Sequence, residues 1–307
     1  MAVFRRKKQA GVWIYNRETG CLEEEAVFEK GFMDLFYGTA PGRLMTRALL
    51  SRRTFSRIYG RLQKRPGSAR RIRPFIEKYN INIEELERPP EYYRNFNDFF
   101  KRKLKPGARP VKKDRGTLIS PADGRLLAYK LKKDLLLPVK GLEFHVGELL
   151  GGYEAADPWL DGTCLKIRLA PSDYHRFCYI DSGFHGPATH VNGRLHSVSP
   201  LALGHQLKIL HGNDREYMVL DTDNFGRVAH VDIGAMAVGR IHQHFRQGGE
   251  FSKGEEKGYF EFGGSTIILL FEPGRIVIDE DILEYSEKGI EALVRYGSQV
   301  GRKAEGL

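Results

Sequence analysis

A serine that follows two glycines and opens an apolar run is the residue best placed for covalent chemistry. The segment 260–271 reads FEFGGSTIILLF, with Ser265 directly after Gly264. A Gly-Gly pair tolerates positive φ and lets other groups approach its carbonyl closely. The Ser265 hydroxyl can therefore turn back onto the preceding carbonyl, and an N-to-O acyl shift there gives an ester. β-Elimination of that ester leaves dehydroalanine, which hydrolyses to a pyruvoyl group and ammonia. Taken alone, the tetrapeptide GGST is more typical of a turn into a strand.

Two further segments carry residue types suited to acid–base chemistry. The stretch LAPSDYHRFCYIDSG (169–183) places His175 between two strand-like runs, where a histidine serves as a general acid or base or simply binds a backbone group. The stretch ISPADGRLLAY (119–129) contains Asp123 in a Pro-Ala-Asp-Gly sequence that is typical of a type I turn. A buried aspartate at that place can orient a histidine and stabilise its charge.

Metal chemistry and disulfide scaffolds have little support in the sequence. The three cysteines, Cys21, Cys164 and Cys178, are far apart and form no CxxC pair, which favours a reducing compartment. The histidine pairs 242/244 and 205/211 lack carboxylate or thiol companions at the spacing of metal ligands. We therefore expect no metal centre and interpret these histidines as structural or surface residues.

The apolar pattern predicts a helical region followed by a β-rich body. The chain has 307 residues, of which 41% are hydrophobic and 29% charged, so a folded chain of one or two domains is expected. Residues 1–30 read as a short peripheral segment and residues 32–95 as mostly helical, with breaks at Pro66-Gly67 and Pro89-Pro90. From about residue 116 onward, short apolar runs alternate with glycine-bearing turns, which indicates strands. The runs are TLIS (117–120), GRLLAYK (124–130), CLKIRLA (164–170), RFCYI (176–180), RVAHVDIGAMAVG (227–239), YFEF (259–262), STIILLF (265–271) and RIVID (275–279).

The fold class expected from this pattern is α+β. Residues 1–95 form a mainly helical, basic, membrane-docking region, and residues 96–307 form the β-rich catalytic body. The tail 280–297 is a possible helix that Gly289 weakens.

The positive charge of the chain is concentrated in one segment. The net charge is +10, and residues 41–74 contain eleven Arg or Lys and no acidic residue. Within them, residues 42–63 mix apolar and basic side chains at an approximately helical spacing, a pattern typical of a peripheral helix on an anionic bilayer. A solvated basic helix on its own domain and a nucleic-acid-binding surface are the alternatives, although no nucleic-acid-binding motif supports the second.

The N-terminus lacks the apolar core of a secretory signal, and no apolar run has the length of a membrane span.

Taken together, the motifs resemble the bacterial, pyruvoyl-dependent phosphatidylserine decarboxylase family. They occur in the family's order as FNDFFKRKLKPGARPV (96–111), SPADG (120–124), APSDYHRF (170–177), SVSPLAL (197–203), VDIGAMAVGRI (231–241) and KGEEKGYFEFGGST (253–266). The N-terminal stretches LFYGTAPGRL and IRPFIEKYNINIEEL resemble its bacterial branch.

The resemblance implies a self-processing enzyme of lipid metabolism. The chain would cleave itself between Gly264 and Ser265 into a β chain of 264 residues and an α chain of 43, which stay associated. Ser265 would become the covalent pyruvoyl group, and the enzyme would convert phosphatidylserine to phosphatidylethanolamine without a metal or pyridoxal phosphate. A homodimer that is peripheral to the cytoplasmic side of the cell membrane, and that does not bind nucleic acid, is also implied.

Site residues follow from the same resemblance, with one departure. Asp123 matches the family's charge-relay aspartate, and His175 matches the histidine associated with decarboxylation. The family usually has a second histidine three residues later as the processing base, whereas this chain has Cys178. A three-residue step on an extended strand reverses the face, so His175 and Cys178 need not share one environment.

The sequence leaves open which residue acts as the processing base in place of the second histidine. A Cys178 thiolate beside Arg176 could act as the base, His175 could serve both steps, or His185 or His190 could reach the site. A lipid-binding relative that is unprocessed because of Cys178 and a basic nucleic-acid-binding β domain are the rival functions.

Overall fold

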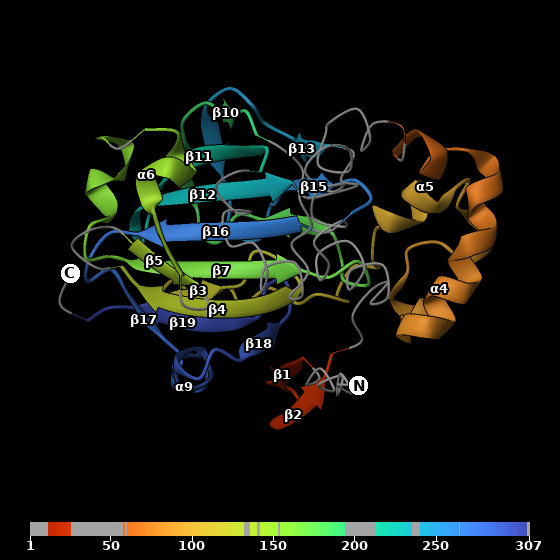
Figure 1. The fold of residues 1–307 in the computed structure, drawn as a ribbon, viewed down its shortest axis with the longest axis horizontal. Helices are drawn as coiled ribbons and strands as arrows, with labels where there is room; N and C mark the ends of the chain where they lie inside the picture. Colours follow the sequence, from red (N-terminus) through yellow and green to blue (C-terminus); the bar gives the residue numbers. More distant parts are fainter. Residues whose placement is uncertain are drawn as a thin grey trace, which may run out of the picture.

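The computed structural model describes residues 12–25, 58, 60–131, 136–139, 142–152, 154–193, 213–234, 240–263 and 265–305. Most of the amphipathic stretch expected at 42–63 lies outside these residues, as do the motif 197–203, His205, His211 and Gly264. Figure 1 shows a β-rich body with the helices of residues 66–100 gathered at one end. The chain is thus α+β and β-rich, as expected, whereas the docking role and the division at residue 95 stay predictions.

Eleven strands of the described chain form one large sheet, and the strand that begins with Ser265 lies in its interior (Figure 1). Its order is β14-β9-β11-β12-β16-β7-β4-β18-β1-β2, with β10 paired to β11. All neighbours are antiparallel except β1 and β18. The bounds are β14 Gly249–Phe251, β9 Gly183–His185, β11 Arg215–Thr222, β12 Gly226–Gly234, β16 Ser265–Phe271, β7 Thr163–Leu169, β4 Gly124–Lys130, β18 Glu291–Val294, β1 Trp13–Asn16, β2 Cys21–Glu24 and β10 Thr189–Val191.

Three smaller sheets complete the β-rich body. The first has the order β13-β15-β8, the second β17-β19-β3, and the third is the pair β5-β6. Their bounds are β13 Ile241–Gln243, β15 Glu256–Phe260, β8 Arg176–Cys178, β17 Ile276–Ile278, β19 Gln299–Lys303, β3 Thr117–Ile119, β5 Leu136–Val139 and β6 Leu142–His145. The main core joins the first two of these sheets to the large one, because Phe177 of β8 and Leu118 of β3 belong to the same buried cluster as Leu269 of β16.

Short helices surround a second, aromatic core next to the sheet. Phe75 of α4 and Phe96 and Phe99 of α5 pack together, and Phe262, which precedes the Gly-Gly pair, joins them. These contacts attach the helical end of the molecule to the segment that leads into β16. The helices at this end are η2 Pro66–Arg71, α4 Ile72–Tyr79, η3 Ile83–Glu85, η4 Pro90–Tyr92 and α5 Phe96–Phe100. Elsewhere in the described chain lie α6 Val146–Leu150, η5 Glu154–Trp159 and α9 Glu280–Glu287.

The strand predictions are confirmed, and two local differences have clear causes. Each of the eight expected runs contains or overlaps a strand. The helix considered for 280–297 ends at Glu287 because Gly289 adopts φ +68°, and the chain continues as β18. Residues 13–24, in the region expected to be mainly helical, instead form the hairpin β1–β2, which joins the large sheet through β18.

A fully buried ionic network lies between the large sheet and β15. Lys257 Nζ donates to Asp232 Oδ2 at 2.7 Å and to Gln243 Oε1 at 2.8 Å, and His230 Nε2 donates to Asp232 Oδ1 at 3.1 Å. Burial alone would raise the pKa of Asp232, but Lys257 and His230 outweigh it and hold that pKa well below its ordinary value. The network is therefore charged, and each charge depends on its partner.

Removing one partner of this network should destabilise the fold far more than removing both. Lys257→Met leaves a buried carboxylate without its cation, so we expect a loss of about 3–5 kcal/mol in the free energy of unfolding. Adding Asp232→Asn should restore most of that loss. Urea denaturation measures both values, and Lys288→Met, at an exposed helical ion pair, is the control that should leave the midpoint unchanged. Equal losses in the single and double variants would contradict the prediction.

Candidate active site

Ser265 is the first residue of β16 and is completely buried. It lies opposite Leu169 of β7 and Gly234 of β12, so antiparallel pairing on both sides sets its position. Gly263, two residues earlier, has φ +139°, a conformation that side chains rarely adopt. A glycine conformation is thus found just upstream of the strand that Ser265 opens.

His175 is the side chain that the structure brings to Ser265. The Ser265 Oγ lies 3.3 Å from His175 Nδ1, and both side chains are fully buried. His175 Nε2 lies 2.9 Å from the carbonyl oxygen of Ala170. Because a carbonyl oxygen only accepts hydrogen bonds, Nε2 carries the hydrogen and Nδ1 is the acceptor for the serine hydroxyl. This is the arrangement of a nucleophile beside a general base.

The surroundings of His175 keep its imidazole neutral. The pKa of His175 is lowered to about 3, chiefly by burial and also by the charges of Arg102 and Arg125, while the bond to Ala170 opposes both effects. A neutral imidazole has a free lone pair at pH 7 and can accept a proton. The imidazole of His175 therefore stays unprotonated throughout the neutral pH range.

Helix α5 contacts both His175 and the segment that precedes Ser265. The Phe100 ring lies 4.1 Å from the His175 ring and 5.0 Å from the Phe262 ring, between centroids. Asn97 Oδ1 accepts a hydrogen bond from the Phe262 backbone N–H at 3.0 Å. The motif FNDFF therefore aligns the two segments that meet at Ser265.

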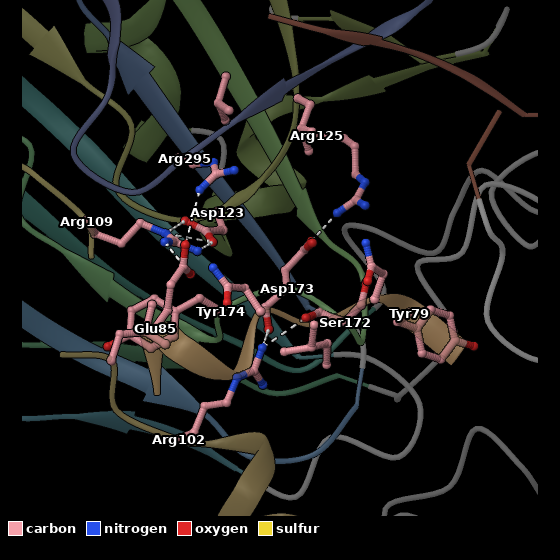
Figure 2. A pocket seen from close by; sticks show the side chains of 16 residues that line it. Tyr79, Glu85, Arg102, Arg109, Asp123, Arg125, Ser172, Asp173, Tyr174 and Arg295 are labelled. Atoms are coloured by element: carbon pink, nitrogen blue, oxygen red, sulfur yellow. Dashed lines mark hydrogen bonds and ion pairs between the residues drawn. The ribbon is translucent and has the colours of Figure 1, made fainter. Parts of the chain in front are cut away.

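A tight turn at residues 170–173 sets the tautomer of His175. Asp173 Oδ2 accepts the Ala170 N–H at 2.6 Å, and its carboxylate pairs with Arg125. Arg102 Nη2 donates to the carbonyl oxygens of Ser172 and Asp173 at 3.0 and 3.1 Å (Figure 2). These bonds hold the Ala170 carbonyl in place, and that carbonyl in turn binds His175 Nε2.

Asp123 takes a place next to this turn and does not contact the serine. Arg109 binds its carboxylate with two nitrogens at 2.8–3.0 Å (Figure 2). The Tyr296 N–H donates to the same carboxylate at 2.8 Å. Among the described residues, Asp123 makes no hydrogen bond to His175 or Ser265. Asp123 directly precedes β4 and anchors Arg109, which also binds Glu85.

Cys178 lies in the main apolar core, away from the serine. It is the last residue of β8 and fully buried, and its Sγ lies 4.0 Å from the Ser120 carbonyl oxygen. Burial raises the pKa of the Cys178 thiol to about 12, so the thiol stays protonated at neutral pH. His175 precedes β8 and Cys178 ends it, and among the described residues Cys178 makes no hydrogen bond to Ser265.

The other histidines that sequence analysis considered lie elsewhere. His185 Nδ1 binds the Gly186 carbonyl at 2.8 Å, and His190 is half exposed beside Asp214. His242 pairs with Glu261 and His244 with Glu256. A search of the described residues finds no group of three or more His, Cys, Asp or Glu that could hold a metal ion.

A cavity of about 280 Å³ borders the 170–173 turn, and Ser172 and Asp173 of that turn line it (Figure 2). Its wall includes Asp123, Asp173 and four arginines, namely Arg102, Arg109, Arg125 and Arg295. Sequence reasoning did not single out these arginines. The available signals were the basic, aromatic run 96–111 and the charged Arg125 inside an otherwise apolar strand pattern.

Within the described chain, no helix combines the length and the apolar character that crossing a bilayer requires.

Comparison with known proteins agrees with the motifs. The profile of the phosphatidylserine decarboxylase family matches residues 96–302. The phosphatidylserine decarboxylase proenzyme 2 of Clostridium acetobutylicum is 41% identical over 94% of this chain and 98% of its own length. The corresponding proenzyme of Chlamydia muridarum is 43% identical over 94% and 96%, and that of Clostridium novyi is 41% identical over 94% and 99%. The resemblance expected from the ordered motifs is confirmed, and the chain belongs to the phosphatidylserine decarboxylase family of enzymes.

Proposed function

We propose that this enzyme decarboxylates phosphatidylserine to phosphatidylethanolamine with a pyruvoyl group made from its own Ser265. The observation that carries the proposal is the buried contact of 3.3 Å between Ser265 Oγ and the unprotonated Nδ1 of His175. The relatives are named as proenzymes, which is consistent with a processing step at this serine.

The processing step needs one base beside the serine. His175 Nδ1 takes the hydroxyl proton while Ser265 Oγ attacks the carbonyl carbon of Gly264. The peptide C–N bond then breaks, the ester C–O bond forms, and the freed amine of residue 265 takes up the proton. Loss of the α-proton next breaks the Cβ–Oγ bond and leaves a carboxylate on Gly264 and dehydroalanine at 265. Water hydrolyses the dehydroalanine and releases ammonia.

The surroundings of residue 265 fit a pyruvoyl group. The position is fully buried, so a reactive carbonyl would be shielded from water, and a neutral imidazole lies beside it. The group would supply a carbonyl that condenses with the substrate amine and accepts the electrons released with CO₂. His175 Nδ1 is our candidate for taking a proton from the substrate ammonium and returning it to the α-carbon of the product.

Asp123 and Cys178 have different roles in this proposal from His175. Asp123 acts as a positioning residue that anchors Arg109 and the Tyr296 backbone. The buried thiol of Cys178 packs in the core, and His175 serves as the processing base. The rival function is an unprocessed lipid-binding relative in which a thiol replaces the processing histidine, and the contact between His175 and Ser265 argues against it.

The two chains produced by cleavage should stay associated. The α chain would begin with β16, which is hydrogen-bonded between β12 and β7 over its whole length. All seven side chains of β16 are buried. Separation would expose this strand and break two ladders of hydrogen bonds. The homodimer implied by the resemblance stays a prediction.

Replacing the serine should abolish cleavage. We expect the purified wild-type chain to give two pieces of 264 and 43 residues in intact-mass spectrometry, the smaller blocked at its N-terminus. Ser265→Ala should remain one species of 35.0 kDa. Thr266→Val, which removes the neighbouring hydroxyl, is the matched control and should be cleaved. Uncleaved, folded wild-type protein would refute the proposal.

Replacing His175 should slow cleavage about 100-fold or more, whereas Cys178→Ala should be cleaved at nearly the wild-type rate. The wild-type rate should not fall between pH 8 and 5.5, because burial holds the pKa of His175 at about 3. The rate is followed by the appearance of the smaller piece after cell-free synthesis.

The stability of the folded protein limits the pH range in which the cleavage rate can be measured. An unfolded chain protonates His175 near pH 6.5, whereas the folded chain does not until about pH 3. This residue therefore disfavours folding as pH falls through that window, and rates are compared only above pH 5.5. A folded Cys178→Ala chain that no longer cleaves would identify the thiol as the base instead.

Docking of the basic segment on an anionic bilayer is the second part of the proposal. Ile58 and Leu62 are exposed large apolar residues one helical turn apart, and Arg61 and Arg65 beside them are exposed. This combination is typical of a helix that inserts apolar side chains between anionic headgroups.

Ile58→Ser with Leu62→Ser and Arg61→Gln should therefore reduce flotation with phosphatidylserine-containing vesicles. Leu283→Ser, which removes an exposed leucine from α9, is the control and should float normally. Binding of the wild-type chain to duplex DNA but not to vesicles at physiological salt would contradict this part of the proposal.

A further inference from the structure

The arginine-lined cavity lies at the same edge of the large sheet as Ser265. Ser265 pairs with Leu169 of β7, and the preceding Arg168 pairs with Arg125 of β4. Neighbouring strands are about 4.8 Å apart, so Arg125 lies two strands, about 10 Å, from the serine along the sheet. The headgroup of a phospholipid and an arginine side chain together can cover such a span.

The four cavity arginines differ in how their charges are neutralised. Arg109 pairs with Asp123 and Glu85, Arg125 with Asp173 and Glu25, and Arg295 with Glu18 and Glu85. Arg102, by contrast, has no carboxylate at ion-pair distance within the described residues. The guanidinium of Arg102 is therefore the cavity charge that lacks an anionic partner.

Arg102 is also buried and incompletely hydrogen-bonded. The residue is 4% exposed, and its Nη2 donates to two backbone carbonyls. Its Nε and Nη1 are buried and have no hydrogen-bond partner in the described part of the chain. A buried charge without a counter-ion is costly, and a bound anion in the adjoining cavity would offset that cost. Arginine is the side chain best suited to bind phosphate oxygens.

We propose that this cavity binds the phosphodiester of the lipid headgroup and that Arg102 is the residue that neutralises it. The inference rests on the proposed function, since the ligand belongs to the proposed substrate. With the phosphate held on the cavity side of the 170–173 turn, the amine of the headgroup can reach residue 265.

The serine carboxylate of the headgroup is the other anion that Arg102 could meet, and the chemistry argues against it. A guanidinium bound to that carboxylate would stabilise the ground state, whose charge disappears as CO₂ leaves. The phosphodiester keeps its charge throughout the reaction. Binding it therefore holds substrate and transition state equally and does not oppose the loss of CO₂.

The test uses the full-length Ser265→Ala chain, which cannot react with a ligand. Calorimetry compares four soluble probes: glycerophosphoserine, glycerophosphoethanolamine, L-serine and inorganic phosphate. We expect both glycerophospho compounds to bind, with L-serine and inorganic phosphate at least tenfold weaker. Adding Arg102→Gln should weaken the glycerophospho compounds at least tenfold, and Arg102→Lys should weaken them less. Arg227→Gln, at a salt-bridged and exposed site on β12, is the matched control.

A second measurement covers the case in which Arg102→Gln does not fold, since Arg102 also holds the turn. In the Ser265→Ala chain, the guanidinium nitrogen signals of Arg102, identified by their loss in Arg102→Lys, should shift on addition of glycerophosphoethanolamine. L-Serine binding as tightly as glycerophosphoserine would overturn the inference in favour of a carboxylate site. Inorganic phosphate binding as tightly as the headgroups, or unmoved Arg102 signals, would overturn it as well.

The failures of the two proposals can be told apart. If wild-type protein cleaves itself and decarboxylates but the Ser265→Ala chain binds no headgroup, only the phosphate site is refuted. If wild-type protein does neither but headgroup binding depends on Arg102, the site stands and the catalytic proposal fails.

Discussion

The hydrogen bond between the Ser265 hydroxyl and His175 Nδ1 is the interaction on which the rest of the site depends. It can form in this sense only because Nε2 is occupied by the Ala170 carbonyl. That carbonyl belongs to a turn held by Asp173 and Arg102. The proposed catalytic contact therefore depends on a series of hydrogen bonds that runs from Ser265 through His175 and Ala170 to Asp173 and Arg102.

Burial gives this contact its chemical character. In water an imidazole titrates near pH 6.5, but at a fully desolvated position flanked by arginines it stays neutral. The same desolvation raises the pKa of Cys178 and leaves its thiol inert. Burial thus has opposite consequences for two residues of the motif DYHRFC. It leaves the imidazole of His175 unprotonated and able to accept a proton, whereas it keeps the thiol of Cys178 protonated.

The charged groups around the cavity follow a related constraint. Three of the four cavity arginines, Arg109, Arg125 and Arg295, pair with carboxylates. Arg102 is left with carbonyl oxygens alone. The same guanidinium holds the 170–173 turn that orients His175. An anion bound to Arg102 would therefore also affect how His175 is aligned with Ser265.

Much of this protein was determined by local sequence. Alternating apolar runs and turn glycines predicted the strands, and the Gly-Gly-Ser motif, His175 and Asp123 were identified from residue type and motif order. These features are local because side-chain periodicity and glycine conformations act over a few residues. Contacts between distant segments determined which of these residues lie together. Ser265 contacts His175, which is 90 positions away in the sequence, and Asp123 pairs with Arg109 instead of with either of them. The environment that sets a pKa, and the cavity beside it, arise only when β4, β7 and β16 align at one sheet edge, because burial and partner charges are properties of the assembled fold.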